Sequence, residues 1–230
     1  MSGKPRIAVI LDENTSGDGR RYEAAKGYFR AIRDAGGLPF GVPYFSEVVD
    51  VVLEEFDGVL STGGRFAYPA NWYVEAEGSK APPSERFDVE RAIIEGILER
   101  SKPILGICAG MQMIACLQGC RLTRDLRERY PEAIEHDKRD YLHPVNIEPG
   151  SALSALIAAP HLLVNSFHCE AVVLVKSPVT PSAYASDGVI EAIEVAGQRF
   201  ALGLQWHQEL LAETDHPGNA IFAGFIEACS

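Results

Sequence analysis

Positive charge is scarce in this sequence. Its 21 Lys and Arg residues face 32 Asp and Glu residues, which gives a formal net charge of −11. Such a chain repels nucleic-acid phosphates and anionic membrane surfaces, so we expect neither as a partner. No apolar run approaches the roughly 18 residues that span a bilayer, and the stretch from Met1 to Arg6 lacks the apolar core of a signal peptide. These absences predict a cytoplasmic protein.

Cysteine is scarce too, and its spacing is irregular. The five cysteines are an odd number and form no CxxC pair, so we expect neither a disulfide framework nor a zinc site. The spacing of His136, His143, His161 and His216 is not that of metal ligands either. The sequence therefore predicts no metal and no cofactor.

The remaining composition is that of a globular domain. Apolar residues make up 47% of the 230 residues and charged residues 23%, and no repeat or linker divides the chain, so we expect a single domain over residues 1–230. The first half alternates strand-like and helix-like segments, which is typical of a parallel sheet. Strands are predicted at 6–11, 38–44, 57–61 and 104–107, and helices at about 20–36, 46–55, 84–102 and 109–118.

The second half is richer in strands. Strands are predicted at 143–148, 162–166 and 171–175, followed by a hairpin of 190–195 with 200–205 and an amphipathic helix that carries Ile221, Phe222, Phe225 and Ile226. Together the two halves predict an α/β fold, with a mostly parallel central sheet flanked by helices and a small antiparallel β element.

The clearest chemical signal is Gly106-Ile107-Cys108-Ala109-Gly110. It lies between a short strand and a helix, as the nucleophile turn of serine hydrolases does, with sulfur in place of the hydroxyl. Glycines on both sides permit a sharp turn, and the start of a helix stabilises a thiolate. A merely buried cysteine is the alternative interpretation.

A general base is predicted at His207, where Gln205-Trp206-His207-Gln208-Glu209 follows a strand. Because side chains alternate with period two, His207 and Glu209 can point the same way. The carboxylate can then accept a hydrogen bond from one imidazole nitrogen while the other faces the thiol. The alternative is a packed histidine beside a solvated acid.

A third element is Thr62-Gly63-Gly64 at the end of another strand. Paired glycines allow a backbone N–H to turn toward a neighbouring active site, as an oxyanion hole requires. The N–H of Ala109 would supply the second donor.

In this order and spacing, the three segments resemble the class I glutamine amidotransferase superfamily along almost the whole chain. The resemblance is to its peptidase C26 branch of γ-glutamyl-γ-aminobutyrate hydrolases. Supporting strings run from Gly119 to Leu126, Val164 to His168 and Ser186 to Ala192. The resemblance implies a three-layer, flavodoxin-like fold and a cytoplasmic hydrolase of putrescine degradation.

The resemblance also implies roles for particular residues. Cys108 would be the nucleophile, His207 the base and Glu209 the residue that orients the imidazole, with the N–H groups of Gly64 and Ala109 binding the oxyanion. Residues expected at the substrate are Gly63, Gln112, Ser166, Phe167, His168 and Arg65. The implied reaction is hydrolysis of a γ-glutamyl amide to glutamate and an amine through a γ-glutamyl thioester.

Departures from the family pattern make the leaving amine the open question. Ala109 replaces an arginine and Gln208 a proline that are usual in this branch. As a hypothesis, Arg65 with Tyr68, Trp72 and Tyr73 forms a lid over the departing amine; an ordinary loop with an aromatic anchor is the alternative. Two alternative functions are open: the protein is a glutaminase subunit that supplies ammonia to a separate synthetase, or a binding or regulatory protein without activity. The sequence leaves a homodimer open.

Overall fold

Strands and helices alternate through the first half of the chain in the computed structural model, which describes residues 3–13, 21–75 and 78–230. The strands are β1 (Arg6–Ile10), β2 (Asp12–Glu13), β3 (Tyr22–Glu23), β4 (Leu38–Val42), β5 (Gly58–Ser61), β6 (Ile104–Ile107), β7 (Arg121–Thr123), β8 (Asp137–Ile147), β9 (His161–Phe167), β10 (Ala171–Leu174), β11 (Val179–Ala185), β12 (Ile190–Val195) and β13 (Ala201–Leu204). The helices are α1 (Lys26–Asp34), α2 (Val48–Glu55), α3 (Arg86–Glu99), α4 (Ala109–Leu117), α5 (Leu126–Arg129), α6 (Ala152–Ile157) and α7 (Asn219–Ala228). Two 3₁₀ turns, Ala70–Trp72 and Gln208–Leu210, complete the elements.

One sheet of nine strands crosses the molecule in the order β4-β1-β5-β6-β13-β12-β11-β8-β9. The first five strands of this order pair in parallel, and every later pair is antiparallel. The predicted fold class is confirmed. The antiparallel strands extend the central sheet itself, and two further antiparallel pairs, β2 with β3 and β7 with β10, lie outside it.

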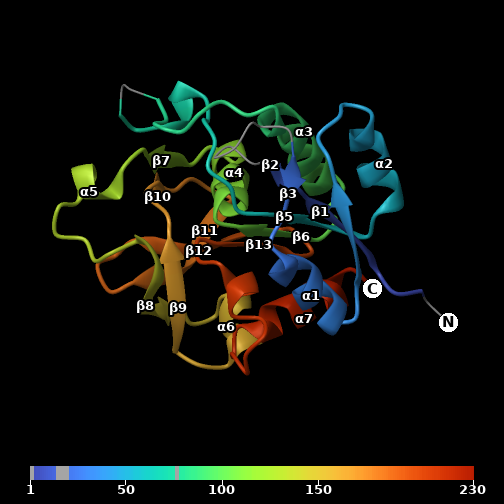
Figure 1. The fold of residues 1–230 in the computed structure, drawn as a ribbon. Coiled ribbons are helices and arrows are strands. Elements are labelled where there is room, and N and C mark those ends of the chain that lie inside the picture. The colour runs from blue at the N-terminus through green and yellow to red at the C-terminus, as the bar shows by residue number, and fades with distance from the viewer. Residues whose placement is uncertain (1–2, 14–20, 76–77) are drawn as a thin grey trace.

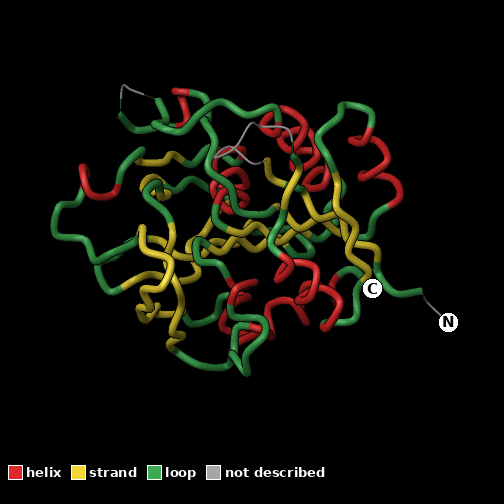
Figure 2. The backbone as a smooth tube through the Cα atoms, in the orientation of Figure 1, coloured by secondary structure: helices red, strands yellow, loops and turns green. Residues whose placement is uncertain are grey.

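Helices cover both faces of this sheet (Figures 1 and 2), with α1, α6 and α7 on one side and α2, α3 and α4 on the other. Burial along β1 shows the consequence, because Ile7 and Val9 pack into the cluster that includes α1 and α7, whereas Ala8 and Ile10 pack into the other cluster. A strand covered on both faces is apolar throughout, which is why this segment shows no alternation in the sequence.

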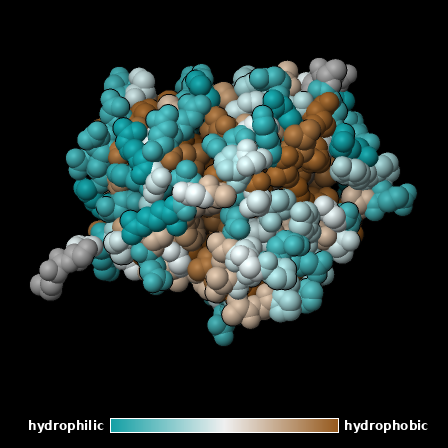
Figure 3. Space-filling model, turned by 180° about the vertical axis from the view of Figure 1, so that it is seen from behind, coloured by the Kyte–Doolittle hydropathy of each residue, from teal (hydrophilic) through white to brown (hydrophobic). Residues whose placement is uncertain are grey.

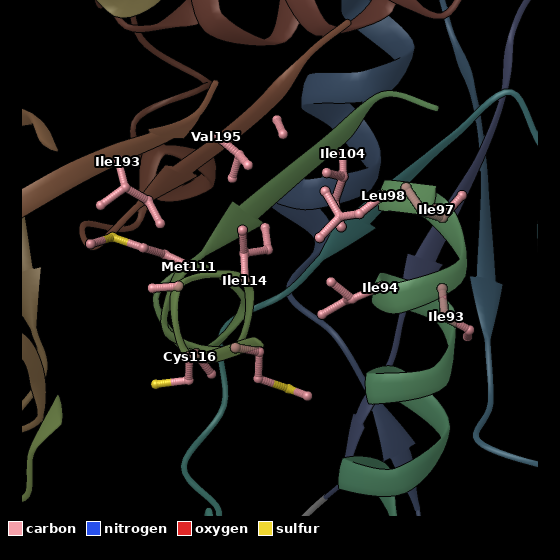
Figure 4. Close-up of a cluster of buried hydrophobic side chains, with 14 of the residues drawn as sticks. Ile93, Ile94, Ile97, Leu98, Ile104, Met111, Ile114, Cys116, Ile193 and Val195 are labelled. Atoms are coloured by element: carbon pink, nitrogen blue, oxygen red, sulfur yellow. The ribbon is translucent and has the colours of Figure 1, made fainter. Parts of the chain in front are cut away.

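The second cluster fills the space between α3, α4 and the sheet. Figure 4 shows Ile94 and Leu98 of α3 on the side of that helix toward Ile114 of α4, with Ile104 of β6 above. Met111 on the other side of α4 points toward Ile193 of β12. This packing fixes α4, whose first turn carries the candidate nucleophile, against the parallel strands.

Several local predictions differ from the structure. Strand β8 begins at Asp137 and not at 143, and β7, α5 and α6 were not predicted. The helix expected at about 20–36 begins only at Lys26, because Tyr22 lies in β3, 43% exposed, with its ring against Tyr44 and Phe45. Strand β11 was not anticipated in the sequence, since it contains Pro181, which a regular strand interior disfavours. The structure accommodates Pro181 beside a register shift in its pairing with β12.

Hydrophilic residues cover much of the surface seen from behind, with hydrophobic ones in a few areas between them (Figure 3). Within the described part of the chain, none of the helices has the length and apolar character needed to cross a membrane.

Candidate active site

Cys108 lies in a strained turn between β6 and α4. Its backbone angles are φ 53° and ψ −103°, a conformation that a residue with a side chain adopts only where the surrounding structure enforces it. The flanking glycines explain how: a Cβ at Gly106 would lie 2.7 Å from the carbonyl carbon of Gly110, and one at Gly110 would collide with Ser61. The Cys108 N–H donates to Leu204 O at 2.7 Å. Helix α4 can therefore begin directly at the sulfur-bearing residue.

His207 and Glu209 point the same way after strand β13. Nδ1 of His207 lies 2.7 Å from Oε1 of Glu209, whose side chain is 2% exposed. Such a pair orients the ring and leaves Nε2 to face the sulfur of Cys108. The two residues have the arrangement that their spacing predicts.

The imidazole of His207 is held as a cation. Burial acts to lower its pKa, but the charges of Glu209 and Cys108 and hydrogen bonds with both side chains outweigh burial and raise the pKa to about 10. Cys108, His207 and Glu209 thus form one connected group, although they come from segments a hundred residues apart in the chain. A thiolate beside an imidazolium is the reactive form of a cysteine nucleophile.

Asn165 holds the backbone of His207 in place. Its amide nitrogen donates to His207 O and its Oδ1 accepts from His207 N–H, both at 2.8 Å. Asn165 is 4% exposed, so both hydrogen bonds are shielded from water. In the sequence it belongs to the string that supports the family resemblance, but no local pattern indicates this contact.

The backbone N–H groups expected in the oxyanion hole differ from their neighbour Gly63 in being free of other acceptors among the described residues. The N–H of Gly63 donates to Tyr28 Oη at 3.0 Å and is therefore occupied. The N–H groups of Gly64 and Ala109 donate to no other residue in the described parts of the chain, and Ala109 stands at a helix start, where N–H groups lack intrahelical acceptors. Both remain free to face a developing oxyanion.

Arg86 of α3 anchors this loop, and the sequence alone does not indicate it. Its guanidinium donates to Thr62 O at 2.7 Å and Gly63 O at 2.9 Å, and it pairs with Glu90 at 2.6 Å. Arg86 and Glu90 are both fully buried. A hydrogen-bonded arginine in the core thus fixes the carbonyls of the loop just before Gly64.

Cys108 lies where two cavities meet. The first, of about 330 Å³, is lined by Tyr68, Gln112, His168 and Glu170. The second, of about 460 Å³, is lined by Asp12, Glu13, Glu23, Ala24, Ala25, Tyr28, Thr62, Gly63, His207, Glu209 and Leu210. Gly64, Arg65, Cys108 and Phe167 border both. The sulfur therefore has substrate-sized space on two sides.

The predicted substrate residues occupy different positions in these cavities. Gln112 contacts the first cavity, with its Nε2 donating to Glu170 O at 3.0 Å and Gln205 Oε1 at 3.1 Å. Phe167 is 40% exposed and borders both cavities, whereas Ser166 is fully buried and directs its hydroxyl to His136 O. The side chain of Ser166 therefore does not reach the site.

The aromatic lid requires correction. Tyr68, Trp72 and Tyr73 are between 5% and 8% exposed, and Trp72 packs against Phe87 of α3 in the core. Among them only Tyr68 lines the first cavity, and its hydroxyl donates to Ala109 O at 3.2 Å. The large rings are buried because the core under this loop has room for them, so they anchor the segment and do not cover the substrate.

Arg65 remains at the mouth of the site. It pairs with Asp137 at 2.7 Å and stacks on Phe167 with its guanidinium carbon 5.5 Å from the ring centre. Half of its side chain is exposed (50%), so this ion pair contributes little and can exchange for another anion.

The unusual Gln208 has a structural explanation. It is fully buried and accepts from Trp206 Nε1 at 3.0 Å, and its amide donates to Asn219 Oδ1 at 3.2 Å at the start of α7. These bonds fix the turn between His207 and Glu209 as a proline ring would. The unusual Ala109 is 1% exposed and places no charge at the site.

The fold and the site define a class of protein: an α/β protein with a cysteine–histidine–carboxylate group at the carboxyl ends of parallel strands. A solved structure from Thermoplasma acidophilum, described as part of a GMP synthase, shares the fold with a TM-score of 0.67 at 19% identity, covering 100% of this chain and 96% of that one. The Peptidase C26 family matches residues 7–209. The chain belongs to the Peptidase C26 family.

Relatives in sequence agree with this assignment. The γ-glutamyl-γ-aminobutyrate hydrolase PuuD of Escherichia coli K12 is 32% identical over 242 residues, covering 100% of this chain and 95% of the relative. Protein NtpR of Enterococcus hirae is 28% identical over 211 residues, covering 88% and 87%. The predicted family membership is confirmed, and the family and its relatives support an amide hydrolase on a glutamine amidotransferase-like fold.

Proposed function

We propose that this protein hydrolyses the γ-glutamyl amide bond of a small γ-glutamylated amine. The observation that carries the proposal is the connected Cys108, His207 and Glu209 group at the junction of two cavities. A binding protein has no need for a buried carboxylate that keeps a histidine charged beside a thiol.

In the proposed reaction, the sulfur of Cys108 attacks the γ-carbonyl carbon and forms a C–S bond. The oxyanion accepts hydrogen bonds from Gly64 and Ala109 N–H, and one such donor is typically worth roughly 3–4 kcal/mol of barrier. His207 gives its proton to the amine as the C–N bond breaks. Water, activated by the now neutral imidazole, then hydrolyses the γ-glutamyl thioester to glutamate.

The position of His207 orients the substrate. The leaving nitrogen must lie near the imidazole that protonates it, and His207 lines only the second cavity. The amine therefore leaves through the second cavity and the glutamyl group occupies the first. There Glu170, 9% exposed, offers a carboxylate to the α-ammonium group.

The identity of the amine rests on two opposing observations. The activity named for the Escherichia coli relative favours γ-aminobutyrate, with Arg65 at the cavity border receiving its carboxylate. The second cavity, however, is lined by Asp12, Glu13 and Glu23, and these charges favour a neutral or cationic amine. A γ-glutamylated diamine is thus the second candidate.

Kinetics with three substrates test the proposal. The substrates are γ-glutamyl-γ-aminobutyrate, γ-glutamyl-butylamine and γ-glutamyl-putrescine, and release of glutamate is measured with wild type and Arg65→Ala. If Arg65 receives the carboxylate, its loss reduces kcat/KM selectively for the γ-aminobutyrate substrate. Equal losses of kcat/KM with all three substrates, together with a wild-type preference for γ-glutamyl-putrescine, would identify a cationic amine as the leaving group. No glutamate from any of them, with turnover of glutamine on addition of a synthetase, would replace the hydrolase with a glutaminase subunit.

A further inference from the structure

Three histidines and a glutamate meet behind the first cavity, on the antiparallel side of the sheet. His136 precedes β8, His143 lies within it, His168 follows β9 and Glu191 belongs to β12. Their exposed fractions are 3%, 1%, 3% and 0%. The proposed hydrolysis uses none of their side chains, so this buried cluster needs an explanation of its own.

His136, His143 and Glu191 lie close enough together to share one metal ion. Oε1 of Glu191 lies 3.2 Å from His136 Nδ1, 3.4 Å from His168 Nε2 and 3.8 Å from His143 Nε2. One atom each from His136, His143 and Glu191 lies within 4.8 Å of the others. Tetrahedral zinc, with bonds of about 2.0–2.1 Å to nitrogen, separates its ligands by roughly 3.3 Å.

The outer nitrogen of each imidazole is already committed as a donor. His136 Nε2 meets Asp187 Oδ2 at 3.0 Å, and His168 Nδ1 meets Glu170 O at 3.0 Å. His143 Nδ1 meets Pro144 O at 3.3 Å. Because these oxygens only accept, the outer nitrogens carry the protons. This is the outer hydrogen bonding that metal-bound histidines commonly make.

The inner nitrogens of His143 and His168 therefore present lone pairs to a carboxylate. His136 Nδ1 also lies 3.2 Å from Ser166 Oγ, which donates its own proton to His136 O, so this nitrogen releases a proton when it binds a metal. Within the described chain, Nε2 of His143, Nε2 of His168 and both oxygens of Glu191 have no hydrogen-bond partner. Buried polar atoms without partners are costly. Converging lone pairs without donors are what a bound cation would satisfy.

We propose that this cluster binds a divalent transition metal ion of the zinc class. His136 Nδ1, His143 Nε2 and Glu191 bind it, and His168 Nε2 lies beside them, 3.4 Å from Glu191 Oε1. The closed, buried arrangement is that of a structural site. The metal would tie β8 to β12 beside His168, which lines the first cavity. The ligands come from β8, the residue before it and the distant strand β12, which is why their spacing in the sequence does not predict a metal.

The first test uses untagged wild-type protein, purified after growth with added zinc. Elemental analysis is expected to give close to one zinc ion per chain. After removal of the metal with a chelator, titration with Co²⁺ is expected to give the intense visible bands of a tetrahedral site. Zinc at a hundredfold excess over its Kd should raise the unfolding temperature of the stripped protein by about 5–10 °C.

Variants assign the ligands. Glu191→Gln and His143→Gln keep the approximate volume, and each is expected to weaken Co²⁺ binding by about tenfold to a hundredfold. His161→Ala on β9 is the matched control, because His161 is exposed and contacts only Asn146 Oδ1, at 2.9 Å, among side chains of the described residues; it should bind Co²⁺ like wild type.

Wild-type protein alone can overturn the proposal, whether or not a variant folds. Zinc far below one ion per chain, together with no visible Co²⁺ bands, would show that the cluster binds protons and no metal ion. Unchanged Co²⁺ affinity in both folded variants would place the metal elsewhere. Neither result depends on activity, so the proposed hydrolysis stands or falls separately.

Discussion

Replacing Glu209 with glutamine removes the charge that keeps His207 protonated while preserving the shape of the side chain. The carboxylate lies 2.7 Å from Nδ1 and is 2% exposed, so solvent screens it little. Without it, the pKa of His207 falls from about 10 toward its ordinary value of 6.5. The amide oxygen can still accept from Nδ1–H, so the variant tests charge and not orientation.

The magnitude follows from the protonated fraction. At pH 8, a pKa of about 10 leaves roughly 99% of His207 protonated, whereas 6.5 leaves roughly 3%. If the imidazolium must deliver the proton, kcat/KM at pH 8 falls by up to about thirtyfold. This value holds for a return to the ordinary pKa; in the variant, burial still lowers the pKa of His207 and Cys108 still raises it. Near pH 6 the loss should be much smaller.

The assay is a pH profile of kcat/KM for glutamate release. Wild type is expected to keep its activity into the alkaline range and lose it near pH 10, and Glu209→Gln should lose it at lower pH. Glu213→Gln, in an exposed ion pair with Arg30, controls for removing a charge nearby. The same fold loss of activity at every pH would refute the argument, because it would mean that Glu209 only positions the ring.

The free energy of unfolding should also depend on the protonation of His207. A raised pKa means that folding favours the imidazolium, so His207 contributes stability that is fully present below about pH 6.5 and lost as pH rises through about 10. The difference between wild type and Glu209→Gln in the free energy of unfolding should shrink over that window, as urea titrations at several pH values can show.

Three further substitutions separate chemistry from support. Cys108→Ala should abolish glutamate release and labelling by a γ-glutamyl electrophile with unchanged circular dichroism; retained turnover would remove it as nucleophile. Asn165→Ala loses two buried hydrogen bonds to the backbone of His207, each worth about 1 kcal/mol. Urea titration should therefore show a free energy of unfolding lower by about 2 kcal/mol, and kcat should fall. Unchanged stability would show that Asn165 does not hold this backbone in place. Gly63→Ala puts a Cβ 2.6 Å from Cε1 of His207 and should lower kcat steeply. Gly78→Ala is the control, because its nearest contact would be at 3.7 Å, and it should keep its activity. Equal activities of the two variants would mean that the His207 ring can shift without loss.

Local patterns predict most of the parallel half of the fold because its helices have a helical period and its buried strands are short, continuous apolar runs. The segment around Ile7 is apolar on both faces, and its burial confirms why. Strand β11 escaped prediction because Pro181 depends on a register shift in its partner strand, which is a property of the pairing. The start of α1 was misplaced because Tyr22 packs on Tyr44, a contact from another segment.

In the candidate site, too, some features are local in the sequence and others depend on the tertiary structure. The amino-acid sequence by itself determined the chemistry: a cysteine between glycines at a strand–helix turn, and a histidine two residues before a carboxylate, since turn geometry and side-chain alternation are local. Only the tertiary structure decided what surrounds them. It placed Arg86 beneath the oxyanion loop, Asn165 on the backbone of His207, and Glu191 among three histidines. Those contacts join residues far apart in the chain, and the long-range packing of sheet and helices brings them within hydrogen-bonding distance.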